Sequence, residues 1–393
     1  MRRMGLLGSL ACLLVLAVFW ASSDAQDTIK FGASYGMTGR IGWIGGDCLD
    51  GAKLIIDEIN AKGGLKGKKI DLVVYDSQNN PDTARTNFEK LIKKDEVVAI
   101  LGPTVTTESQ TVLPVAEKAK IPFIVVSGGI EVNEKILPEY KKEGKKCYMW
   151  ALSVGTQRQN EAKVAWLKKK GHKKMGNIEP LDQMGDLSGQ TYKEFCQKYG
   201  LELIAQERFD DKGTDFTTQM SKIKAAGADS IGSMCSGAPA VTLVKNRDQV
   251  GMKDLPFMIS DANISKKFIE LLGENTHNVY SVGAKIEYVS YLKEGDPQKK
   301  VIADFQKRFK DKYNKEPQSW FFAAVGYDSA LMFIKAIEAV GTDGEKMRDW
   351  LEKQSKFQGA QAMYTWSDVD HRGIGLDQCL VVIVKGGQWV PVE

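Results

Sequence analysis

Residues 45–64, GGDCLDGAKLIIDEINAKGG, decide how this chain folds. Apolar side chains recur at helical spacing through residues 45–60: Leu49, Ala52, Ile55, Ile56 and Ile59. Gly63 and Gly64 then end the helix, because glycine adopts the left-handed cap conformation. Two short apolar runs, residues 29–33 and 70–75, flank this helix. The stretch therefore predicts a strand–helix–strand unit, the building block of a parallel sheet.

The same alternation continues on both sides of a charged surface stretch at residues 131–146. Before that stretch we expect helices at 81–94 and 106–119 and strands at 97–101 and 123–126. After it we expect helices at 161–170, 187–199, 216–226 and 241–249, and strands at 174–178, 202–207, 230–234 and 257–259. Two consecutive α/β units follow from this order.

The last third of the chain complicates a picture of two separate units. Strands are expected at 279–284, 362–366, 380–384 and 388–390, and helices at 299–313, 319–340 and 346–354. These elements have to join the two sheets already formed. The chain must then cross between the units several times, which predicts a hinge.

The N-terminus has the three parts of a secretory signal. Arg2 and Arg3 precede an apolar run at residues 6–20, and Ser23 and Ala25 supply the small residues of a cleavage site. The run is shorter than the roughly 20 residues of a membrane span, which disfavours the alternative of a retained anchor. Cys12 lacks the sequence context of a lipoprotein cysteine. We therefore expect a signal peptide at residues 1–25 and a periplasmic protein.

Charge and cysteine content exclude several classes. Removing Arg2, Arg3 and Asp24 changes the net charge from +4 to +3, and the short lysine runs have no aromatic platform, so nucleic-acid binding is not expected. Of the six cysteines, five remain after cleavage and none forms a CxxC pair. Disulfide pairing stays open.

Three loops at the carboxyl ends of expected strands are candidates for ligand contact. Thr106 and Thr107 begin a helix, whose N-terminus favours a carboxylate, although plain helix capping is an equal alternative. Ser127-Gly128-Gly129 brings backbone close to a ligand, or forms a simple tight turn. Asp261 pairs with an ammonium group or caps the next helix.

Catalytic patterns do not occur. His172, His277 and His371 are far apart, and the chain contains no HExxH, GxSxG or GxGxxG motif. The stretch at 63–69 has the wrong spacing for a phosphate loop. We therefore expect neither an enzyme nor a cofactor or metal site.

Several ordered motifs carry a family resemblance. They are GASYGMTG at 32–39, DEINAKGG at 57–64, Asp215-Phe216-Thr217, and GYDSA at 326–330. Together they resemble the leucine/isoleucine/valine-binding protein family, the type I periplasmic binding proteins. The resemblance implies an α/β fold of two Rossmann-like lobes with parallel sheets, joined by a three-strand hinge. Lobe 1 would comprise residues 27–149 plus about 281–358, and lobe 2 about 150–280 plus about 359–393.

The resemblance also implies site residues and partners. Trp43 and Phe322 match aromatic positions beside the ligand, while Thr106, Thr107, Ser127 and Gly128 match its carboxylate-binding loops. Asp261 matches the acid that holds the ammonium group. Gly129, Met184 and Ser236 depart from the family, since a Thr and two Tyr are common there. A monomer that delivers its ligand to an ABC permease is implied.

The sequence features bear on three possible functions. A branched-chain or related amino acid is favoured over an aromatic carboxylate or short amide as the transported ligand, because Asp261 argues for a positive group. A ligand-sensing subunit of a signalling system would use the same fold. An exported α/β enzyme is disfavoured by the missing catalytic motifs.

Overall fold

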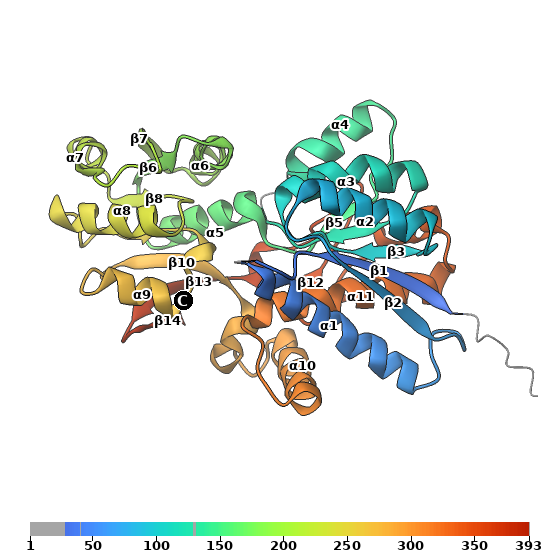
Figure 1. Ribbon diagram of the computed structural model, residues 1–393. Coiled ribbons are helices and arrows are strands. Elements are labelled where there is room, and N and C mark those ends of the chain that lie inside the picture. The colour runs from blue at the N-terminus through green and yellow to red at the C-terminus, as the bar shows by residue number, and fades with distance from the viewer. Residues whose placement is uncertain (1–27, 40, 129–130, 393) are drawn as a thin grey trace, which may run out of the picture.

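A computed structural model describes residues 28–39, 41–128 and 131–392 (Figure 1). The expected signal peptide, residues 1–25, lies outside the described residues. The chain forms two lobes, each around its own sheet, with the first strands on one side of Figure 1 and β6–β10 on the other.

The first lobe contains a five-stranded parallel sheet in the order β2-β1-β3-β4-β5. Its strands are β1 (Ile29–Tyr35), β2 (Ile70–Asp76), β3 (Ala99–Leu101), β4 (Phe123–Val125) and β5 (Met149–Ala151). Neighbouring residues face opposite sides of this sheet, because strand side chains alternate. Leu101 and Ile124 belong to one buried cluster, whereas Ile100 and Phe123 belong to another. Both faces are therefore covered.

The first-lobe helices come from distant parts of the chain. They are α1 (Gly42–Ala61), α2 (Pro81–Lys93), α3 (Thr106–Ala119), α4 (Leu137–Lys142), α10 (Pro297–Tyr313), α11 (Trp320–Val340) and α12 (Gly344–Leu351). α2 and α3 cover one face of the sheet, and α1 and α11 cover the other (Figure 1). α11 is long and apolar enough to span a membrane, but 72% of its most apolar window is buried. α11 is the core helix of this lobe.

α1 and α11 pack with their backbones in contact. A Cβ atom at Gly51 would overlap the carbonyl of Ala323, and one at Gly326 would overlap the carbonyl of Cys48. Only glycine permits this approach at both positions. Close helix packing therefore accounts for the glycine of Gly51-Ala52 and for the first residue of the GYDSA motif at 326–330.

The second lobe contains a seven-stranded sheet in the order β14-β13-β10-β9-β8-β6-β7. Its strands are β6 (Lys174–Pro180), β7 (Glu202–Phe209), β8 (Ser230–Gly232), β9 (Phe257–Met258), β10 (Val279–Ala284), β13 (Cys379–Lys385) and β14 (Gln388–Pro391). Its helices are α5 (Gly155–Lys169), α6 (Gln183–Tyr199), α7 (Thr217–Ala225), α8 (Ala238–Gln249) and α9 (Lys266–Leu272).

This second sheet is mixed rather than wholly parallel. β13 pairs antiparallel to β10, and β14 pairs antiparallel to β13. Gly386 and Gly387, both at positive φ, make the two-residue turn of that hairpin. The expectation of a parallel sheet therefore holds for the βαβ strands and is wrong for the final hairpin.

The chain passes between the two sheets three times: after β5, after β10, and before β13. The third crossing lies later than the division inferred from sequence, which placed residues from about 359 in lobe 2. Tyr364, Trp366 and Ile374 are buried in the first-lobe core. The small hairpin β11 (Phe357–Gln358) and β12 (Met363–Tyr364) carries part of this segment. This boundary therefore moves to about residue 375.

Two further differences concern segments that lack a clear period. The charged stretch at 131–146 contains a π-helical turn, Val132–Ile136, followed by α4, with Val132 and Leu137 buried. α5 begins at Gly155, six residues before the expected start at 161. Its first turns are polar and show no apolar period, so the sequence pattern does not reveal them. Three short elements, β5, β11 and α9, were not expected from the sequence, and the expected elements otherwise agree with the structure to within a few residues.

Candidate ligand-binding cleft

The main cavity of the described residues lies between the two lobes and has a volume of about 740 Å³. It is lined by residues that follow strand ends in both sheets: Gly128 after β4, Ser153 after β5, Ser236 after β8 and Asp261 after β9. The carboxyl ends of parallel strands are where ligands bind in sheets of this kind. Cavities of roughly 300–1,000 Å³ hold small-molecule ligands.

The first lobe contributes three aromatic rings, which we call the aromatic wall: Trp43, Phe321 and Phe322. Trp43 lies in the first turn of α1 and Phe322 in the first turn of α11. Their ring centroids are 5.5 Å apart at an interplanar angle of 73°, an edge-to-face contact. Phe321 contacts Phe322 in the same manner at 5.1 Å.

Two carboxylates hold the start of α11 beside the aromatic wall. Asp47 Oδ2 accepts from the Ser319 N–H at 2.8 Å. Glu287 Oε1 accepts from the Phe321 N–H at 2.9 Å and from the Ser319 hydroxyl at 3.0 Å. Desolvation at the cleft wall raises the pKa of Glu287, and these two donors oppose that rise. Glu287 lines the cavity but was not anticipated from the sequence.

Asp261 lines the cavity from the second lobe. It begins a short 3-10 turn after β9, and the Ser260 hydroxyl donates to its Oδ1 at 3.3 Å. Burial raises the pKa of this carboxyl, and the nearby Lys163 ammonium opposes the rise. An acid in this position can pair with a positively charged ligand group.

Behind Asp261 lies a pair of charged groups that the sequence did not single out. Lys163 on α5 is fully buried, and burial lowers its pKa to about 8 against the influence of Asp261 and Glu179. Glu179 on β6 is also fully buried, and burial raises its pKa to about 7. The Ser188 hydroxyl and the Met234 N–H donate to Glu179 at 2.6 and 3.0 Å. The buried Lys163 ammonium of the second lobe therefore favours the ionised form of Asp261.

Six of the predicted site residues line the cavity: Trp43, Gly128, Met184, Ser236, Asp261 and Phe322. Thr106, Thr107 and Ser127 are not among the described lining residues. The Thr106 and Ser127 hydroxyls lie 2.5 Å apart and hydrogen-bond to each other. Ser127 directly precedes Gly128, which does line the cavity. Thr107 is exposed at the start of α3. Gly129 lies outside the described residues.

Arg372 lies outside the cavity lining and holds two loops of that lining from behind. Its buried guanidinium donates to the Ser153 carbonyl at 2.9 Å and to the Gly128 carbonyl at 3.0 Å. Gly155 leaves room for it, because a Cβ there would lie 2.9 Å from the Arg372 Cζ. The first and third crossings are therefore tied to the loop that follows β4.

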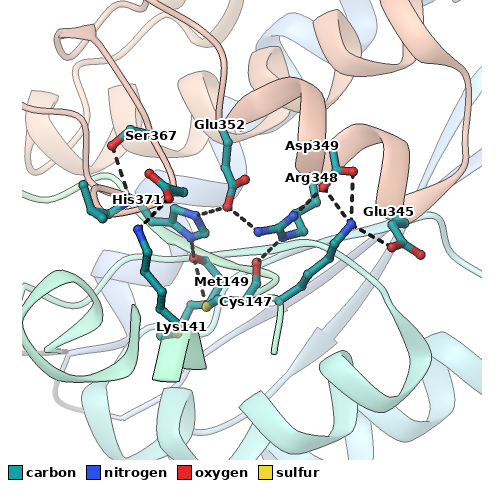
Figure 2. Close-up of polar contacts among 12 residues, drawn as sticks. Lys141, Cys147, Met149, Glu345, Arg348, Asp349, Glu352, Ser367 and His371 are labelled. Atoms are coloured by element: carbon teal, nitrogen blue, oxygen red, sulfur yellow. Dashed lines mark hydrogen bonds and ion pairs between the residues drawn. The ribbon is translucent and has the colours of Figure 1, made fainter. Parts of the chain in front are cut away.

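His371 has a structural place in the first lobe. His371 is buried and stacks on Trp150 at 4.4 Å. Its Nδ1 lies 2.7 Å from the Met149 carbonyl and its Nε2 lies 3.0 Å from Glu352 Oε1 (Figure 2). The same polar cluster continues to Arg348, which donates to the Cys147 carbonyl at 3.1 Å (Figure 2). It joins α12 and the segment before β13 to the edge strand β5.

Within residues 28–39, 41–128 and 131–392, no group of three or more His, Cys, Asp or Glu side chains could hold a metal ion. The five cysteines of that part of the chain are unpaired. The cleft therefore offers carboxylates, hydroxyls, backbone groups and aromatic rings for binding.

Comparison with known proteins agrees with this architecture. The chain is 22% identical over 356 residues to Leu/Ile/Val-binding protein homolog 7 of Brucella suis, covering 90% of this chain and 88% of that protein. It is 23% identical over 346 residues to the leucine-, isoleucine-, valine-, threonine-, and alanine-binding protein of Pseudomonas aeruginosa, covering 88% and 87%.

Solved structures share the fold. A periplasmic binding protein type 1 from Bordetella pertussis aligns with a TM-score of 0.72 at 25% identity, over 93% of this chain and all of that chain. The isoleucine complex of a branched-chain amino acid transporter substrate binding protein from Streptococcus pneumoniae aligns with a TM-score of 0.69 at 23% identity, with the same coverage. The family model described as periplasmic binding protein matches residues 28–387. The chain belongs to the periplasmic binding protein family.

Proposed function

We propose that this protein is the solute-binding component of an ABC transporter and captures a branched-chain or related amino acid in the interlobe cleft. The observation that carries the proposal is a single acid, Asp261, presented by the second lobe into a cleft whose first-lobe side is aromatic. The names of the Pseudomonas relative and of the Streptococcus isoleucine complex point the same way. Family membership supports an extracytoplasmic location.

The proposed binding mode uses both lobes. Asp261 holds the ligand ammonium group by a charge-assisted hydrogen bond. Gly128 and the adjoining Thr106–Ser127 hydroxyl pair hold its carboxylate, once a ligand draws the loops together. Trp43 and Phe322 pack against its side chain, and Met184 and Ser236 widen the second-lobe side.

Closure follows from the two-sided contact. Because each lobe binds a different end of the ligand, the closed arrangement binds it more tightly than the open one, and the equilibrium shifts toward closure. The three crossings between the sheets supply the hinge. A permease that recognises the closed arrangement then receives the ligand. Residues 1–25 would export the chain, and the mature protein would act as a monomer in the periplasm.

The test is a thermal-shift screen of the mature protein with amino acids, aromatic carboxylates and short amides. A true ligand at about 100 times its Kd stabilises the protein by about 2.7 kcal/mol, which gives a clear rise in Tm. Stabilisation by amino acids, confirmed by calorimetry, is expected. Stabilisation by an aromatic carboxylate or an amide alone would refute the amino-acid assignment.

Transport is separated from sensing by uptake. Deleting the gene should abolish high-affinity uptake of the radiolabelled ligand, and restoring it should recover uptake. Unchanged uptake together with a lost transcriptional response to the ligand would identify a sensing subunit instead.

A further inference from the structure

The charges around the cleft do not balance. Its described lining contains two carboxylates, Asp261 and Glu287, and no Lys, Arg or His. Two buried cations lie behind the lining rather than in it. Lys163 already faces both Asp261 and Glu179, and Arg372 donates to the Ser153 and Gly128 carbonyls. A ligand entering the cleft therefore meets an excess of negative charge.

Glu287 is placed to receive a positive group. Its Oε1 accepts both hydrogen bonds from the start of α11, while no residue of the described ranges donates to its Oε2. The start of α11 is itself unsuited to a ligand carboxylate, because Asp47 and Glu287 already accept from its first N–H groups. This end of the cleft therefore disfavours anions.

The aromatic wall adds a second, independent feature to the same end of the cleft. Phe321, whose N–H binds Glu287, contacts Phe322, and Phe322 contacts Trp43. Ring faces beside a carboxylate attract organic cations, because the ring quadrupole and the negative charge act in the same direction. An alkyl side chain alone would use the rings and leave Glu287 unpaired.

Closure of the lobes raises the free-energy cost of leaving Asp261 and Glu287 without cationic partners. When the lobes close, water is removed from both carboxylates, and a buried carboxylate without a cationic partner is strongly unfavourable. One α-ammonium group pairs with Asp261 on the second lobe. Glu287 projects from the other wall, just after the second crossing, and needs a partner of its own.

We infer that the cleft selects an amino acid whose side chain ends in a cationic group, an inference that rests on the proposed function. The α-ammonium binds Asp261, and the side-chain cation binds Glu287 against Trp43 and Phe322. The aliphatic stem of such a side chain packs on the apolar lining between them, which includes Val126 and Val282. Lysine, ornithine and arginine have this chemistry.

The experiment compares cations with neutral ligands of the same shape. Calorimetry on the mature wild-type protein measures Kd for lysine against norleucine, and for arginine against citrulline. We expect each cation to bind at least about tenfold more tightly, the size of one charge-assisted hydrogen bond. Glu287→Gln keeps an acceptor for α11 but removes the charge, and should reduce each preference to within about threefold. Glu294→Gln, at a carboxylate 93% exposed on the same connection, is the matched control and should keep the preference.

The outcomes separate this inference from the proposed function. Norleucine or leucine binding as tightly as lysine would overturn the inference and leave amino-acid capture standing. The wild-type comparison alone decides this, so a Glu287→Gln variant that folds poorly does not rescue the inference. A preference that survives in a folded Glu287→Gln protein would also overturn it. Absence of binding by every α-amino acid would instead overturn the proposed function.

Discussion

Replacing Asp261 by asparagine tests the second-lobe half of the proposed site. The change keeps the shape of the side chain and removes its charge, so the ligand ammonium loses an ionised partner. A hydrogen bond to a charged group contributes about 1.5–3 kcal/mol, which corresponds to roughly 10–150-fold in Kd.

The buried Lys163 makes an increase in Kd near the upper end of that range the expected result. In the wild-type protein this buried cation faces two carboxylates, Asp261 and Glu179. In the variant only Glu179 remains, and the positive charge of Lys163 is no longer offset on the side that faces the cleft. Repulsion of the ligand ammonium then adds to the lost attraction, and we expect Kd to rise about 30–150-fold.

Isothermal titration calorimetry at pH 7 measures this change. Asp254→Asn, at an exposed position of the same lobe, is the control and should leave Kd unchanged. The unliganded variant should keep its Tm within a few degrees, since Asp261 lines the cavity and is only partly buried. An increase in Kd of less than about threefold, in a variant that melts normally, would show that Asp261 does not hold the ligand.

Four further changes probe other parts of the structure. Thr106→Val removes one hydroxyl of the pair with Ser127 and should raise Kd about 5–10-fold by calorimetry, with little change in Tm. Arg372→Met leaves two backbone carbonyls at the hinge without this donor and should lower the free energy of unfolding by about 2–4 kcal/mol in urea. Asp328→Asn should cost a similar amount, about 2–4 kcal/mol, because the buried carboxylate accepts two backbone N–H groups. Burial raises the pKa of Glu179 to about 7 from an ordinary value near 4.5. The free energy of unfolding should therefore fall as the pH rises between these two values, by at most about 3 kcal/mol from this group. Glu179→Gln should remove this contribution to the loss of stability between pH 5 and pH 8.

Each of these has a contrary result. Unchanged affinity in Thr106→Val would mean that the hydroxyl pair only caps α3. Urea midpoints within experimental error of wild type would contradict the roles given to Arg372 and Asp328. A pH profile of unfolding that is the same in Glu179→Gln and wild type would show that Glu179 does not titrate in this window.

Elements with a strong period could be predicted from the sequence alone. α3 has the predicted bounds, 106–119, because a threonine start and a regular apolar face mark it clearly. β5, Met149–Ala151, cannot be predicted from its sequence, since three residues are too few to show an alternation. Only pairing with β4 identifies it as a strand, and that pairing is a long-range property. The start of α5 cannot be predicted for a related reason. Thr156 and Gln159 face the cleft, so the first turns have no apolar period.

Only some of the site residues could likewise be predicted from the sequence. Trp43 and Phe322 were found through the family resemblance, and the fold brings them into contact across nearly the whole length of the chain. Glu287 lies in a 3-10 segment, Lys285–Tyr291, whose sequence carries no motif. Lys163 lies in a helix rich in lysine, and nothing local distinguishes the buried one from those in solvent. Burial of charge depends on which elements meet, which the periodicity of one element cannot reveal.

The crossing of α1 and α11 at Gly51 and Gly326 has a consequence at a distance. Trp43 and Phe322 belong to the same two helices, on their cleft-side turns, so the spacing of the helices also sets the spacing of the rings. A methyl group at either glycine would push the two helices apart and so separate the rings, without contacting a ligand. Gly51 and Gly326 thus help to set the width of the cleft between Trp43 and Phe322, although neither residue has a side chain that could contact a ligand.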